Sequence, residues 1–140
     1  MLRKISVLLL IGATSQLYAF DKNQVILDQV FWGTWQIQHP QMQCKEVYEF
    51  SKPGHFTHQT LQKRMTGDFV VLRSPEKNEH DILQLAVKTD NGLADCSGER
   101  SNFAGQPASF ALKWSSPRNA ELCLDAQATR CTGLQLVKQP

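Results

Sequence analysis

The chain lacks the patterns that mark most enzyme active sites and metal sites. It contains no G-x-S-x-G or H-E-x-x-H motif, no glycine-rich phosphate loop and no dinucleotide fingerprint. Its four cysteines show none of the Cys-x-x-Cys spacing that a zinc site usually has. These absences favour a protein that is not an enzyme and that uses neither a metal ion nor another cofactor.

Long basic runs are also absent. The chain has 15 Lys and Arg residues against 13 Asp and Glu, and Arg3 and Lys4 alone account for the excess. A nucleic-acid partner is therefore not expected, because phosphate binding needs a concentrated basic patch. Lys63 and Arg64 form the densest basic pair in the remainder, and we expect them at a solvated hairpin end.

Apolar residues form a long stretch only at the N-terminus. Arg3 and Lys4 precede the mainly apolar segment 5–11, and Ala19 offers a small residue for cleavage. This is the pattern of a secretory signal peptide, and the apolar part is shorter than the about 20 residues that span a bilayer. We therefore predict a signal peptide over residues 1–19 and one domain over residues 20–140. The mature protein would be periplasmic or secreted, with no transmembrane segment.

All four cysteines lie in the predicted domain, at Cys44, Cys96, Cys123 and Cys131. An even number in a small exported domain indicates two disulfides, with free thiols or a metal site as the alternatives. Leucines alternate with Cys123 and with Cys131, so a hairpin would place both sulfurs nearly opposite each other on its outer face. The alternation therefore favours Cys123–Cys131, which leaves Cys44–Cys96.

The domain is predicted to be almost entirely β-strand. Before the strands, Asn23 is expected to cap a short helix that ends by Gly33 and carries an apolar stripe of Ile26, Leu27, Val30 and Phe31. Eight strand-like runs follow, at 34–38, 44–50, 56–62, 69–73, 82–88, 109–115, 121–125 and 132–138. Their regular spacing favours an all-β fold, either a sandwich or an up-and-down barrel.

The residues that open the first strand favour the barrel. Gly33-Thr34-Trp35 follows the expected helix, and residues 48–57 place aromatic strands on both sides of a glycine turn. This pattern resembles the small bacterial lipocalin-like (calycin) barrels. The resemblance implies a small closed up-and-down barrel of about eight antiparallel strands, here stabilised by disulfides. It further implies that Gly33 permits a tight turn, that Trp35 plugs the closed end, and that Lys138, or alternatively Arg130, packs across that tryptophan.

A second resemblance covers about a dozen residues. Gly33-Thr34-Trp35 with Cys44 nine residues after Trp35 is similar to the opening of periplasmic inhibitors of serralysin-type metalloproteases. In those small exported barrels an N-terminal arm enters the protease cleft, and residues 20–24 would be that arm here. In that family the second cysteine follows soon after the first, whereas here the next one is Cys96.

The remaining aromatic residues indicate what the barrel holds. Five of them are expected to point inward as candidate ligand-binding residues, namely Phe50, Phe56, Phe69, Phe110 and Trp114. Barrels of this size either fill with such side chains or keep a cavity for one small ligand. We expect a monomeric, non-enzymatic binding protein of the bacterial envelope that holds a small apolar ligand. The alternative is a protein-binding module such as a protease inhibitor.

Polar side chains offer no clear catalytic constellation. The histidines His39, His55, His58 and His80 are expected to be exposed. His55 and His58 are spaced three apart, as are Glu46 and Glu49, so each pair should point to opposite faces of a strand. Neither pair is therefore expected to form a metal site or an acid–base pair.

Overall fold

The protein is a closed barrel of eight antiparallel strands in the computed structural model, which describes residues 20–41 and 43–140. This confirms the predicted all-β closed barrel, whereas the predicted signal peptide lies outside the described residues. The elements are the 3₁₀ turn η1 (Lys22–Gln24), the helix α1 (Leu27–Val30), β1 (Gly33–Gln38), β2 (Glu46–Ser51), β3 (His55–Thr60), β4 (Lys63–Leu72), β5 (Asp81–Asp90), β6 (Pro107–Ser116), β7 (Asn119–Cys123) and β8 (Cys131–Lys138).

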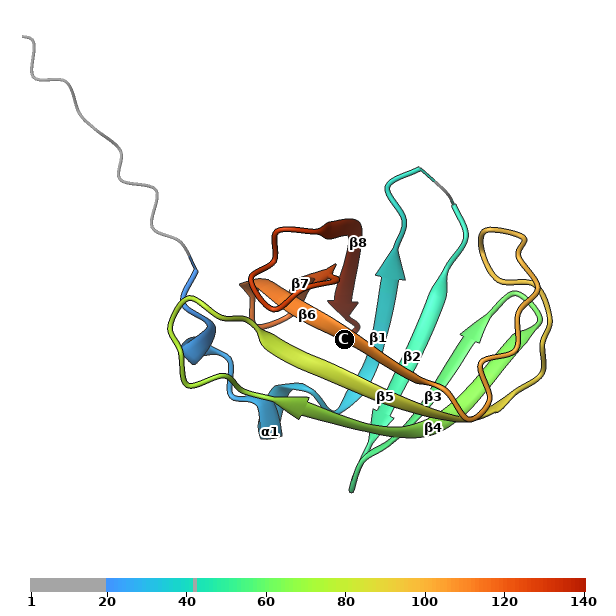
Figure 1. Cartoon of the computed structure of the whole chain (residues 1–140), viewed down its shortest axis with the longest axis horizontal. Helices are drawn as coiled ribbons and strands as arrows, with labels where there is room; N and C mark the ends of the chain where they lie inside the picture. Colours follow the sequence, from blue (N-terminus) through green and yellow to red (C-terminus); the bar gives the residue numbers. More distant parts are fainter. Residues whose placement is uncertain (1–19, 42) are drawn as a thin grey trace, which may run out of the picture.

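The strands follow one another around the barrel in sequence order. Each pairs with the next, and β1 pairs with β8 to close the sheet, with Trp35 in register with both Tyr48 and Lys138. Figure 1 shows α1 and the 73–80 loop together at one end, which we name the closed end. The β3–β4 turn and the 91–106 segment lie at the opposite end, which we name the open end (Figure 1).

The N-terminal helix is shorter and more broken than expected. Instead of one helix beginning at Asn23, the chain forms η1 and the single turn α1, and Asp21 caps η1 by accepting a hydrogen bond from the Asn23 backbone N–H at 2.9 Å. Val25 between them has extended backbone and is fully buried. Its side chain enters the core, so burial outweighs the propensity to continue a helix.

The fourth strand is twice as long as the expected 69–73 run, because β4 begins at Lys63. Lys63 is only 1% exposed, so the expectation of a solvated hairpin end was wrong for this residue. Gly67 lies where the β4–β5 register shifts, and a Cβ there would come within 2.0 Å of the Ala86 carbonyl oxygen. Glycine is therefore required at this register shift, because a side chain would collide with the neighbouring backbone.

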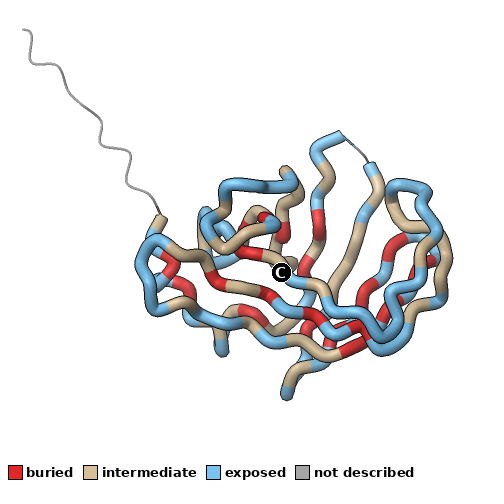
Figure 2. Tube along the Cα trace, in the orientation of Figure 1, coloured by how far each residue is buried: buried red, intermediate tan, exposed pale blue. Residues whose placement is uncertain are grey.

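Aromatic side chains fill the barrel toward the closed end. Phe31, Trp35 and Phe50 are each at most 2% exposed. The ring centroid of Phe31 lies 5.3 Å from that of Trp35 and 4.8 Å from that of Phe50. Figure 2 shows buried positions recurring along the strands while the loops at both ends are mostly exposed. The core is therefore one continuous apolar layer inside the sheet.

The two disulfides confirm the pairing that the alternation favoured, Cys44 with Cys96 and Cys123 with Cys131. Cys123 and Cys131 face each other across β7 and β8. The expected exposure on the outer face was wrong for Cys123, which is fully buried, whereas Cys131 is exposed. A register shift between Glu121 and Cys123 makes both Leu122 and Cys123 buried, which simple alternation does not anticipate.

Candidate functional site

The closed end is sealed by the residues expected to have structural roles. Trp35 is fully buried and donates from its indole nitrogen to the Phe31 carbonyl at 2.8 Å. Lys138 donates from Nζ to the Val30 carbonyl, and this nitrogen lies 5.9 Å from the Trp35 ring centroid. Gly33 has φ +122°, which a side chain would strain. Lys138, and not the exposed Arg130, therefore makes the contact that the lipocalin-like resemblance implies.

The N-terminal segment is bound to this same end. The Lys22 ammonium donates to the carbonyls of Ser74, Glu76 and Glu79 at 2.8, 2.9 and 2.5 Å. Arg73 donates to the Lys22 carbonyl at 3.0 Å, and Phe20 packs against the core. Residues 20–24 thus lie against the barrel, and the geometry shows no projecting arm of the kind that the inhibitor interpretation needs.

Most of the expected ligand-binding aromatics belong to the packed core. Phe50 and Phe56 are each 1% exposed, and Phe69 stands with its ring centroid 4.7 Å from that of Phe50. Trp114 is buried and donates to the Asp81 carboxylate at 2.9 Å. Phe110 differs from these four, because it lines a cavity at the open end.

This open-end cavity has a volume of about 290 Å³ and lies inside the barrel, beneath the 91–106 segment. Its apolar wall comes from strands on several sides and from the covering segment, and includes Tyr48, Met65, Leu85, Val87, Phe103, Pro107, Ala108 and Phe110. Its polar wall consists of Glu46, His58, Lys63, Asp95 and Gln106. A mainly apolar chamber with a few polar groups is the usual composition of a small-molecule site. Larger hollows of about 470, 380 and 360 Å³ include exposed outer-face or closed-end residues in their lining.

A carboxylate between two histidines forms one polar side of the cavity. Glu46 accepts from His39 Nε2 at 2.5 Å through one oxygen and from His58 Nε2 at 3.1 Å through the other. Burial alone would raise the pKa of the Glu46 carboxyl, but the hydrogen bonds and charges of His58 and His39 outweigh it and lower the pKa. Glu46 therefore remains an ionised acceptor that orients both rings.

His58 is a second polar side chain whose burial departs from expectation. It is 3% exposed rather than solvated, and its ring centroid lies 4.5 Å from that of Tyr48. While Nε2 faces Glu46, the buried Nδ1 atom has no hydrogen-bond partner among the described residues. Burial, and then the charge of Glu46, raises the pKa of Tyr48, so its hydroxyl stays neutral beside this site.

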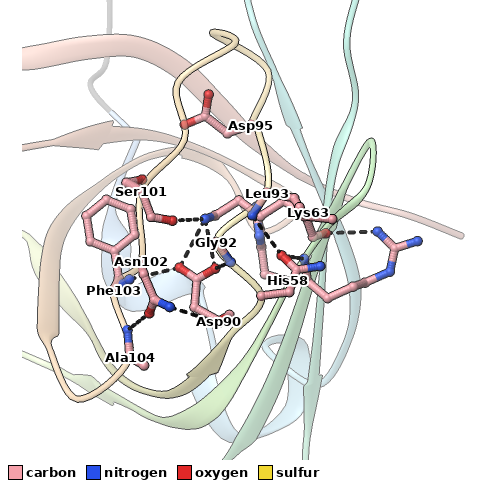
Figure 3. A network of polar contacts seen from close by, with 12 residues as sticks. His58, Lys63, Asp90, Gly92, Leu93, Asp95, Ser101, Asn102, Phe103 and Ala104 are labelled. Atoms are coloured by element: carbon pink, nitrogen blue, oxygen red, sulfur yellow. Dashed lines mark hydrogen bonds and ion pairs between the residues drawn. The ribbon is translucent and has the colours of Figure 1, made fainter.

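A buried ion pair holds the 91–106 segment over the cavity. Lys63 Nζ donates to both Asp90 oxygens at 2.9 and 3.0 Å and to the Ser101 carbonyl at 2.9 Å. Asp90 also accepts from the backbone N–H groups of Gly92 and Phe103, at 2.8 and 2.9 Å (Figure 3). Burial raises the pKa of Asp90, yet these backbone hydrogen bonds and Lys63 together lower it. The pair stays charged and ties both ends of the segment to β4 and β5.

The Cys44–Cys96 disulfide is the second fastening of this segment. It joins residue 96 to the chain just before β2, and Thr60 at the end of β3 lies within hydrogen-bonding distance of both sulfurs, at 3.4 and 2.9 Å. The covering segment is therefore bonded on two sides of the barrel mouth. Such a fixed cover favours a cavity that is formed before any ligand arrives.

The described residues do not combine these groups into a recognisable catalytic or metal site. Two clusters of potential metal ligands occur, His39 with Glu46 and Cys96, and Glu121 with Cys123 and Cys131. In both clusters the sulfur already belongs to a disulfide and is not a thiolate. The histidines next to Glu46 hydrogen-bond to that carboxylate and not to a nucleophile. That the protein has no enzyme activity and binds no metal therefore remains a prediction.

Sequence reasoning missed Glu46, His58 and Lys63, although the signal was present. Glu46 alternates with Tyr48 and Phe50 in β2, and His58 alternates with Phe56 in β3, so each shares a face with inward aromatics. The expectation that paired Glu46 and Glu49 point apart agrees with the structure, where Glu49 is exposed. Its polar character had suggested that His58 is exposed. The structure buries it instead, because Glu46 provides a hydrogen-bond partner inside the barrel.

Together these features describe a small disulfide-bonded barrel with a mainly apolar chamber at its open end. Comparison of the chain with models of known protein families, with curated proteins and with solved structures gave no match. Among the described residues, no helix is long and apolar enough to cross a membrane. The lipocalin-like resemblance therefore rests on the sequence pattern and stays a prediction.

Proposed function

We propose that this protein is an exported, non-enzymatic binding protein that holds one small, mainly apolar molecule in the open-end cavity. The observation that carries the proposal is the partly open chamber of about 290 Å³ between Tyr48, Val87 and Phe110. Ligand pockets usually measure about 300–1,000 Å³. The chamber lies just below that range and has room for roughly ten water molecules, at about 30 Å³ each. A compact ligand, such as a single substituted ring, fits that space.

Export is supported by the sequence and by the cysteines. The N-terminal pattern is typical of a signal peptide, and both disulfides are of a kind that persists outside the reducing cytosol. The two together support the proposal of a periplasmic or secreted location. The inhibitor alternative draws no support from the packing of Lys22 against the closed end.

The test is titration of the oxidised protein with para-xylene and para-cresol, followed by NMR of methyl groups lining the cavity. Ala108 lines the chamber on β6, so Ala108→Phe should fill it and weaken binding at least about tenfold, which corresponds to about 1.4 kcal/mol. Ala86 is exposed on the neighbouring strand β5, so Ala86→Phe is the matched control and should bind like the wild type. Failure of both probes to shift Met65 or Val87 signals, or equal weakening by the two variants, would contradict the proposal.

A further inference from the structure

We propose that His58 Nδ1 is the recognition atom of the cavity and that it selects a neutral molecule carrying a hydroxyl donor, such as a phenol or a small alcohol. This inference rests on the proposed function, and it adds the chemical class of the ligand. Among the described residues, Nδ1 is buried and has no hydrogen-bond partner, and its side chain belongs to the cavity lining. A buried polar atom without a partner is rare in folded proteins and calls for a missing one.

The hydrogen bond from His58 to Glu46 decides which kind of partner is missing. An ionised carboxylate can only accept, so the ring nitrogen facing it, Nε2, must carry the proton. The lowered pKa of Glu46 keeps that carboxylate ionised at neutral pH. In a protonated ring both nitrogens donate, whereas in the neutral ring Nδ1 presents a lone pair. For the neutral ring, the ligand group that completes the site is therefore a hydrogen-bond donor.

The charges around the cavity disfavour an anionic ligand. Glu46 on β2 and Asp95 in the covering segment are the acidic residues of the lining. Lys63 on β4 is the lining cation, but its ammonium is fully engaged by Asp90 and Ser101. A ligand carboxylate next to His58 would come near the Glu46 carboxylate without a free cation to receive it. Fatty-acid-like molecules are thus poor candidates, although the apolar wall would accept their chains.

The remaining walls define the rest of the ligand. Tyr48, Phe103 and Phe110 contribute aromatic surface to the chamber, and Met65, Leu85 and Val87 contribute aliphatic surface. One donor next to His58 and an apolar body against these side chains together match a small hydroxylated ring. Pairing a buried acceptor that is otherwise unsatisfied should improve affinity by about tenfold over a ligand of the same shape that cannot donate.

The experiment compares four ring compounds of similar shape, titrated into the wild-type protein at mildly alkaline pH and monitored by NMR. Para-cresol carries a donor, para-xylene replaces it with a methyl group, para-methylanisole keeps the oxygen without the proton, and para-toluate adds a carboxylate. We expect para-cresol to bind about tenfold tighter than para-xylene and para-methylanisole, and para-toluate to bind most weakly. Equal affinity for the first three compounds would overturn the inference without any variant protein.

A substitution of His58 then tests whether its Nδ1 atom is the acceptor that recognises the ligand hydroxyl. His58→Gln keeps an amide N–H that can reach Glu46 and removes the Nδ1 acceptor. It should abolish the advantage of para-cresol, so that the variant binds para-cresol and para-xylene with affinities within about twofold of each other. A para-cresol advantage that survives in His58→Gln would overturn the inference while leaving the binding function intact. Absence of cavity binding by all four compounds would instead overturn the proposed function itself.

Discussion

At the scale of single residues, the open end depends on charges that are withdrawn from water. The side chains of Lys63 and Asp90 are 2% and 0% exposed, and each satisfies the other. Removing water from two ions is unfavourable, and the hydrogen bonds between them must offset this cost. Lys63 meets this requirement because it donates to both Asp90 oxygens and to the Ser101 carbonyl. A partner lost from such a pair leaves a buried charge without compensation, which is strongly destabilising.

The first prediction concerns Asp90. At neutral pH, Asp90→Asn should lower the free energy of unfolding by about 3–5 kcal/mol, because Lys63 is left buried without its counter-ion. The pKa of Asp90 is lowered in the folded protein, so its contribution is present above its unfolded pKa of about 3.9 and is lost as pH falls through the folded value. The stability gap between wild type and variant should therefore shrink below about pH 4.

Urea unfolding at a series of pH values measures that gap. Asp68→Asn is the matched control, because Asp68 pairs with His55 and Lys88 at exposed positions and should change stability little at any pH. A gap that stays constant into the acidic range would mean that Asp90 does not act as an ionised partner of Lys63.

At the scale of elements, the two disulfides constrain the chain over very different distances. Cys44–Cys96 spans a sequence separation of 52 and fastens the covering segment across the barrel mouth, whereas Cys123–Cys131 spans 8 and joins adjacent strands. In the chain-entropy account, a crosslink stabilises by restricting the unfolded chain, and the effect grows with the length of the closed loop.

The second prediction follows from this difference. Replacing Cys44 and Cys96 together by alanine should lower the free energy of unfolding by about 4 kcal/mol, whereas the same change at Cys123 and Cys131 should lower it by about 2.5 kcal/mol. Urea unfolding under oxidising conditions compares the two double variants directly. Equal losses, or a larger loss from the shorter crosslink, would show that native packing rather than loop closure sets their contribution.

At the scale of the whole molecule, closure of the sheet removes the strand edges through which copies of the protein could associate. Every strand pairs on both sides, since β8 returns to β1, so the barrel offers no free edge for another strand. Exposed edges are the usual route to intermolecular strand pairing.

The third prediction is that the mature protein is a monomer in solution. Sedimentation velocity over a wide concentration range should show one species, because closure removes the edges through which sheets associate. Native mass spectrometry of the same sample should give a mass four hydrogens below that of the reduced protein, as two disulfides require. A dimer whose population rises with concentration would contradict this expectation and direct attention to the outer faces of the strands.

Sequence reasoning succeeded where the physical signal is local. Strand alternation and turn residues identified all eight strands, although β4 begins six residues before the expected 69–73 run, and alternation around Cys123 and Cys131 gave the correct disulfide pairing. It failed at Lys63 and at Val25, where burial overrides polarity or helix propensity. It failed at the site as well, since the aromatics chosen as ligand contacts mainly fill the core and Phe110 alone of those five lines the open-end cavity.

By itself the sequence determined the all-β class and the turns, because period-two alternation and turn residues act over a few positions. It also determined the cysteine pairs, because alternation paired Cys123 with Cys131 and left Cys44 to pair with Cys96. The tertiary structure alone decided which inward faces oppose one another. Glu46 and His58 meet because β2 and β3 pair in one register, and Lys63 reaches Asp90 across 27 residues because β4 and β5 bring their ends together. Closure of the barrel brings Glu46, His58 and Lys63 into the wall of one chamber.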